Sequence, residues 1–116
     1  MTIDANTLAQ FTGTEGYWTH PLYGRINYTD GVKYVADNGA AWLIDKIAIT
    51  TLHVGKLNRE TFLTWTLTKS DGGAQLVCTD GNDTELFREI IGFTDFPLET
   101  IKLFLTNNIL MLPSEY

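Results

Sequence analysis

Three short turn sequences divide this chain, and each lies between two runs rich in β-branched, aromatic and aliphatic residues. They are Asp30-Gly31, Asp71-Gly72-Gly73 and Asn107-Asn108. Aspartate, asparagine and glycine tolerate the positive φ angles that the tight turns of β-hairpins require. The sequence therefore predicts three β-hairpins, which limit the possible folds more than any other feature of the chain.

The first two predicted hairpins differ in clarity. One joins residues 25–29 to residues 32–36 across the first turn. The other is the clearest in the chain, because leucine and tryptophan alternate strictly with threonine over residues 63–67 and an apolar face returns through residues 74–79. Such alternation is typical of a strand with one buried and one solvated face.

The last part of the chain is also predicted to be β. A turn at residues 80–83 precedes a strand over residues 85–93, and residues 101–106 pair with residues 109–112 across the asparagine turn. A helix over residues 98–110 is the alternative. We favour the hairpin because apolar residues alternate along it and two asparagines inside a helix are unfavourable.

One convincing helix is predicted, over Ala40–His53. Its apolar residues recur at helical spacing and form one broad face. Asp37 or Asn38 can cap the free amides at its start, and Gly55 is placed to end it.

A second, short helix is predicted over residues 2–10, with Asp4 or Thr2 as its cap. Its apolar side consists of Ile3, Leu8 and Phe11. Residues 11–24 are predicted to be irregular because glycines and a proline interrupt them.

These elements predict an α+β fold in which one main helix packs on a curved antiparallel sheet built from β-hairpins. A sheet that wraps around a helix, as in cystatin-like folds, is one form of this architecture. The chain has no repeat, low-complexity tract or linker, and 116 residues is a common size for one domain. We therefore expect a single domain over residues 1–116.

Charge and composition restrict the classes of partner. Lys and Arg total 8 against 14 acidic residues, and the resulting net charge of −6 argues against direct nucleic-acid binding. No apolar stretch approaches the roughly 20 residues of a membrane helix. The absence of a secretory leader and the single cysteine favour a cytoplasmic protein that does not bind membranes.

Few residues are suited to catalysis or metal binding. Cys78 lies on the apolar face of a strand and is predicted to be buried, and His53 ends the main helix. His20 is the remaining catalytic candidate, which a small enzyme would combine with a nearby acid such as Glu15 or Asp30. No metal-ligand spacing and no phosphate-binding glycine pattern is present, so we expect no metal and no cofactor.

The stretch from residue 17 to residue 34 combines aromatic side chains with glycines. Tyrosine, tryptophan and arginine are enriched at the centres of binding interfaces. The same residues serve equally well to pin a glycine-rich loop onto a small core. The residues that we predict to bind a ligand or partner are Tyr17, Trp18, His20, Tyr23, Arg25 and Tyr28.

Several segments resemble a small bacterial family that is catalogued only as a domain of unknown function. The matching pieces are residues 10–15, His20-Pro21-Leu22, Tyr28-Thr29-Asp30-Gly31-Val32, Ala41-Trp42-Leu43 and Leu112-Pro113-Ser114-Glu115-Tyr116. They span most of the chain, and residues 56–89 match more loosely. The resemblance implies a shared fold and surface, and it supplies no catalytic residues.

Three functional hypotheses follow. The first is a non-enzymatic module of the bacterial cytosol that binds a protein or a small molecule through residues 16–25 and the first hairpin. The second is an acidic inhibitor of a nucleic-acid enzyme, as small phage or plasmid regulators are. The third is a small enzyme that uses His20. An exposed strand edge would also allow pairing in a homodimer.

Overall fold

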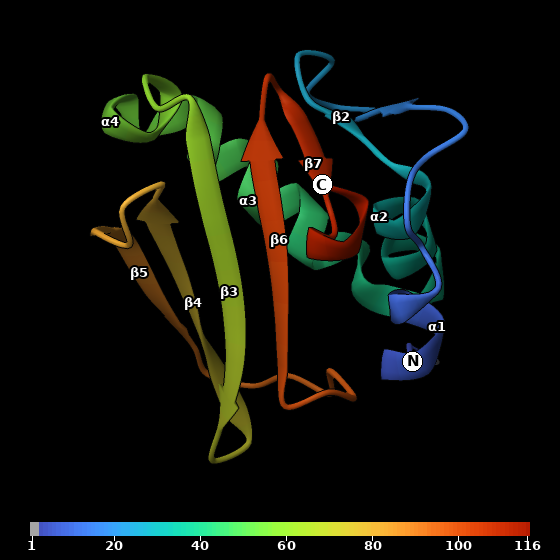
Figure 1. Cartoon of the computed structure of the whole chain (residues 1–116). Coiled ribbons are helices and arrows are strands. Elements are labelled where there is room, and N and C mark those ends of the chain that lie inside the picture. The colour runs from blue at the N-terminus through green and yellow to red at the C-terminus, as the bar shows by residue number, and fades with distance from the viewer. Residues whose placement is uncertain (1–2) are drawn as a thin grey trace.

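The computed structural model describes residues 3–116, which form a mixed α+β fold around a seven-stranded sheet (Figure 1). The strands are β1 (Trp18–Thr19), β2 (Asn27–Tyr28), β3 (Phe62–Ser70), β4 (Gly73–Asp80), β5 (Glu85–Ile91), β6 (Thr100–Thr106) and β7 (Ile109–Met111). Their order in the sheet is β1-β2-β7-β6-β3-β4-β5. The two end strands are therefore β1 and β5.

The helices are α1 (Ala5–Ala9), α2 (Asp30–Val35), α3 (Ala41–His53) and α4 (Gly55–Asn58), with single turns η1 (Ala36–Ala40) and η2 (Pro113–Glu115). In Figure 1, α3 lies behind the long strands. Its buried residues Ile44 and Ile47 belong to the same hydrophobic core as Trp65, Leu76 and Leu103 of the sheet. Burial of such side chains is the main stabilising contribution to a fold of this size.

The central hairpin forms as predicted. β3 and β4 pair antiparallel along their length, and their alternating apolar side chains are buried. At the tip, Asp71 and Gly72 have φ angles of 46° and 84°, which suit a tight hairpin turn. Gly73 lies so close to the neighbouring strand that a Cβ atom there would be 2.2 Å from the carbonyl oxygen of Ile91.

The C-terminal hairpin is also confirmed, and the alternative helix over residues 98–110 is wrong. β6 and β7 pair antiparallel across Asn107 and Asn108, whose φ angles are 53° and 62°. Asparagine is one of the few residues that adopts this left-handed region at low cost. Two such residues in sequence end the extended conformation and reverse the chain.

The predicted first hairpin is wrong. Asp30 and Gly31 do not form a turn between strands but begin helix α2, which ends at Val35. The hydroxyl oxygen of Thr29 accepts a hydrogen bond from the Val32 amide and so caps the start of this helix. Threonine is a good helix N-cap, and this cap decides between two structures that the Asp-Gly pair allows equally.

In the sheet, β2 therefore lies between β1 and β7 and does not pair with the segment that follows it. Asn27 pairs with Ile109 and Tyr28 pairs with Leu110, and the two strands run parallel. The expected sheet, antiparallel throughout and built only from hairpins, needs this correction. A parallel pair requires a long connection, which here contains α2, α3, α4 and the strands β3 to β6.

The main helix is confirmed and ends at His53 as predicted, but it starts one residue later, at Ala41, and its capping differs from the prediction. Neither Asp37 nor Asn38 caps it: Asp37 pairs with Lys33, and the Asn38 amide donates to the Tyr34 carbonyl oxygen. Gly39, with a φ angle of 109°, makes the kink that separates α2 from α3.

The predicted end of α3 and the predicted start of α1 have different outcomes. Gly55 does not end α3; the helix ends at His53, and Gly55 begins the short helix α4. At the N-terminus, Asp4 caps α1 by accepting a hydrogen bond from the Thr7 amide, as predicted. The alternative cap, Thr2, lies outside the described residues.

Candidate functional site

The aromatic segment, residues 17–25, forms a closed loop at one end of the sheet. β1 pairs antiparallel with β2, with Trp18 opposite Tyr28. Beyond this pair, the His20 amide donates to the Ile26 carbonyl oxygen at 2.9 Å, and the Ile26 amide donates to the Tyr23 carbonyl oxygen at 2.9 Å. A short hairpin is thus present in this part of the chain, and its turn lies at residues 21–25.

His20 holds the turn from inside. Its side chain is buried, with the residue only 2% exposed. Nδ1 accepts hydrogen bonds from the amides of Leu22 and Tyr23, both at 3.1 Å. Because Nδ1 is an acceptor, the ring proton lies on Nε2, which donates to Asp45 Oδ1 at 2.7 Å. Both nitrogens are therefore occupied by internal hydrogen bonds.

The environment of His20 differs from that expected of a catalytic residue. Its acidic neighbour is Asp45 of α3, and neither Glu15 nor Asp30 bonds to the ring. Tyr23 lies against the imidazole, with ring centroids 5.1 Å apart. The hydrogen bonds of the ring support the turn and leave neither nitrogen available to a substrate.

The outer side of the segment carries large apolar side chains in contact with solvent. Tyr17 is 61% exposed, Trp18 is 46% exposed and Leu22 is 74% exposed. Arg25, in the same segment, is also exposed. Exposed apolar side chains that occur singly are ordinary, whereas here three of them occur within six positions of the chain.

Trp18 is held in place by two charged residues of α2. Its indole N–H donates to Asp30 Oδ1 at 3.3 Å, and the Lys33 ammonium lies 4.7 Å from the centre of its ring. Asp30 also accepts a hydrogen bond from the Glu15 amide through Oδ2. These donors, first the Glu15 amide and then the Trp18 indole, lower the pKa of Asp30 below its ordinary value.

The six residues predicted to bind a partner thus have two different environments. Tyr17, Trp18 and Arg25 are exposed, whereas His20 and Tyr28 are buried and Tyr23 is half-buried against the core. Two further residues belong to this site. Leu22 lies inside the predicted contact segment 16–25 but was not among the six residues predicted to bind, and Asp45 lies 25 positions from His20, so no local pattern connects them.

Two further predictions are confirmed away from this segment. The Cys78 side chain is buried on the inner face of β4, and burial raises the pKa of its thiol to about 12. His53 is the last residue of α3, and its Nδ1 lies 2.9 Å from the Ile49 carbonyl oxygen. Cys78 is thus part of the hydrophobic core, and His53 bonds to the backbone of its own helix.

The chain is thus a small α+β protein with a partly exposed aromatic segment, which is held by the β1–β2 pair and by the hydrogen bonds of His20. The sequence profile of DUF6876, described as a "Family of unknown function", matches residues 2–116, and the chain belongs to this family. No curated protein and no solved structure matches it significantly. In the part of the chain that the structure describes, no helix is long and apolar enough to cross a membrane.

Proposed function

We propose that this protein is a non-enzymatic module that binds a partner protein through Tyr17, Trp18, Leu22 and Arg25. The observation that carries this proposal is the difference in burial between the side chains of the aromatic segment, residues 17–25. Its inner side is held by the buried His20, and its outer side presents large apolar side chains to solvent. This arrangement is typical of a recognition surface.

The rigidity of the frame favours binding. Ordering a loop and its side chains on association costs free energy, which a segment already held in one conformation avoids. Here the turn amides, the β1–β2 pair and the Trp18 indole are bonded within the protein. The partner surface that fits is apolar at its centre, with an acidic group to meet Arg25.

The test is a pull-down from native lysate, followed by affinity measurement with the recovered partner. Tyr17→Ala and Leu22→Ser remove exposed contacts and should leave thermal stability unchanged, because neither side chain is buried. Each is expected to weaken binding about tenfold or more. Phe93→Ser, at an exposed position in a different part of the chain, is the matched control. Equal recovery with all variants would refute the proposal.

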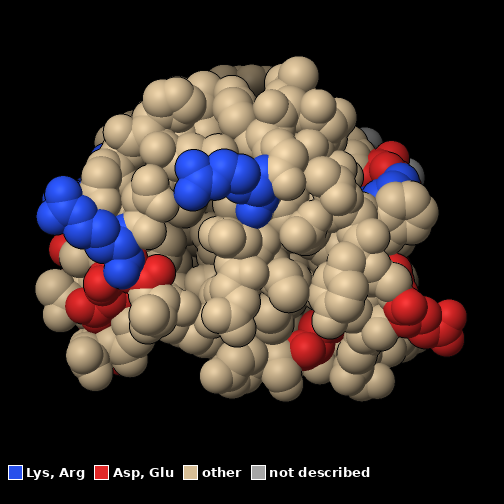
Figure 2. All heavy atoms as spheres, turned by 90° about the horizontal axis from the view of Figure 1, so that it is seen from above, with Lys and Arg blue, Asp and Glu red and all other residues tan. Residues whose placement is uncertain are grey.

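The other two functional hypotheses have less support. An acidic inhibitor of a nucleic-acid enzyme would need free carboxylates that imitate phosphates. Several carboxylates instead form bonds within the protein, among them those of Asp30, Asp45 and Glu89. On the face shown in Figure 2, acidic side chains lie in separate groups instead of one continuous patch. An enzyme using His20 would need that ring to be accessible, and it is buried.

Several expectations remain proposals. These are a bacterial source, a cytoplasmic location, a single domain, the absence of direct nucleic-acid or membrane binding, and no use of a cofactor. Pairing of two copies through β5, an end strand of the sheet, is the form that a homodimer would take. The helix α3 against the sheet is also compatible with a cystatin-like arrangement.

A further inference from the structure

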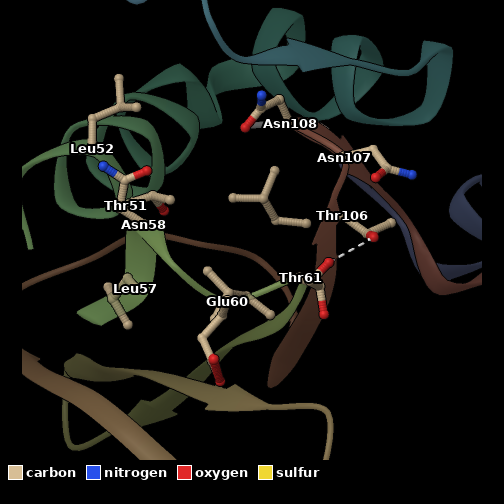
Figure 3. A pocket seen from close by; sticks show the side chains of 11 residues that line it. Thr51, Leu52, Leu57, Asn58, Glu60, Thr61, Thr106, Asn107 and Asn108 are labelled. Atoms are coloured by element: carbon tan, nitrogen blue, oxygen red, sulfur yellow. Dashed lines mark hydrogen bonds between the residues drawn. The ribbon is translucent and has the colours of Figure 1, made fainter. Parts of the chain in front are cut away.

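A cavity of about 210 Å³ opens where α3, α4 and the β6–β7 turn meet (Figure 3). Its apolar part is formed by Leu57, Leu63 and Leu105, which are all buried. This volume would hold about seven water molecules, so it suits a ligand no larger than a monosaccharide. The cavity is distinct from the aromatic segment, which contributes no residue to it.

The rim of the cavity carries three asparagines, Asn58, Asn107 and Asn108. Within residues 3–116 their side-chain amides form no hydrogen bond to the protein, whereas the hydroxyls of two neighbouring threonines are already used. Thr51 donates to the Ile47 carbonyl oxygen, and Thr106 donates to the Thr61 carbonyl oxygen, the bond drawn in Figure 3. The asparagine amides, each with donors and an acceptor, are therefore available to a ligand, together with the hydroxyl of Thr61, which also lines the cavity.

The turn at Asn107 and Asn108 can be made without these amides. Both residues have positive φ angles, and glycine adopts this conformation at lower cost than asparagine. Glycine is the commonest residue at the second position of such turns. Asn108 at this position keeps an amide beside the opening that a glycine would remove (Figure 3).

The charges around the cavity exclude one class of ligand. Among the described residues that line it there is no lysine or arginine, and Glu60 is the single ionisable one. An anion such as a phosphate would have no positive partner there and would be repelled by the carboxylate. An uncharged ligand with hydroxyl or amide groups can bond to the asparagines while its carbon face contacts the leucines.

We propose that this cavity binds a neutral, monosaccharide-sized molecule that carries hydroxyl or amide groups. The asparagine amides would bond to its polar edge, and Leu57, Leu63 and Leu105 would contact its apolar face. A ligand of this size held by a few hydrogen bonds is expected to have a dissociation constant on the order of millimolar.

The experiment is an NMR titration of the isotope-labelled protein with D-glucose, N-acetyl-D-glucosamine and glucose 6-phosphate. D-glucose tests the recognition of hydroxyl groups alone. N-acetyl-D-glucosamine tests the recognition of hydroxyl groups together with an amide group. At least one is expected to give saturable shifts at the amides of Asn58, Asn107 and Asn108. Glucose 6-phosphate is expected to bind more weakly than glucose.

Two variants make this test specific. Asn108→Gly keeps the turn, so it should preserve the thermal midpoint and weaken sugar binding about tenfold. Asn58→Ala, at an exposed position of α4, provides an independent check. Tyr17→Ala should bind sugar normally, which separates this proposal from the partner-binding surface. No saturable shift with either neutral sugar, or equal shifts in Asn108→Gly, would overturn the proposal.

Discussion

Glu115 bonds the C-terminal end of the chain to the first turn of α2: its Oε2 accepts a hydrogen bond from the Gly31 amide at 3.0 Å. The other carboxylate oxygen, Oε1, accepts from the Thr29 hydroxyl at 2.6 Å and from the Leu112 amide at 3.0 Å. A negative group at the start of a helix is also electrostatically favourable, although α2 is short. One side chain of η2 thereby connects the cap and first turn of α2 to Leu112, the residue that follows the last strand.

Gly31→Ala should destabilise the protein because of this contact. A Cβ atom at position 31 would lie 2.5 Å from Glu115 Oε1 and 2.6 Å from Leu112 Cδ1. We expect a loss of about 1–3 kcal/mol in the free energy of unfolding, measured by urea denaturation. Gly13→Ala is the control, since nothing lies within 4 Å of a Cβ there. Equal stability of the two variants would contradict the role of the contact.

His20→Ala should loosen the aromatic segment. The change removes the acceptor for the Leu22 and Tyr23 amides and leaves a cavity beneath the turn. A loss of roughly 2–3 kcal/mol is expected. Asp45→Asn keeps an acceptor for the ring proton and should cost less than about 1 kcal/mol. Hydrogen exchange at Leu22 and Tyr23 is the measurement, and unchanged protection in His20→Ala would show that the ring does not hold the turn.

Acidification should release the loop that Asp30 holds. Its folded pKa is lowered below the ordinary 3.8, so its contribution to stability is present above that value and is lost as pH falls through the folded pKa. The indole proton resonance of Trp18 and the amide of Glu15 should therefore shift together in an NMR titration below pH 4. In Asp30→Asn this shared transition should be absent; its persistence would assign it to another group.

Cys78 should be unreactive in the folded protein. Burial is the largest cause that raises its pKa from 9.0 to about 12, so almost no thiolate exists at pH 8. The stability that the neutral thiol provides is present below pH 9 and is lost as pH rises toward 12. Reaction with a thiol-specific chromogenic reagent at pH 8 should be slow in buffer and fast in urea. Rapid labelling in buffer would show that β4 opens.

Much of the fold follows from local sequence patterns. The alternation in β3, the turn at Asp71 and Gly72, and the paired asparagines at 107 and 108 each determine a conformation within a few residues. The apolar spacing of α3 does the same at helical period. Such features can be predicted because the interactions that decide them are short in sequence.

The tertiary structure decided the rest. Asp30 and Gly31 suit a hairpin tip and a helix start equally, and the choice depends on Thr29 and on Glu115, which is 86 positions away from that threonine. The same holds for the candidate site, where Tyr17 is exposed and Tyr28 is buried. Residue type determines what a side chain can bind, but contacts between distant segments determine whether it faces the solvent or the core.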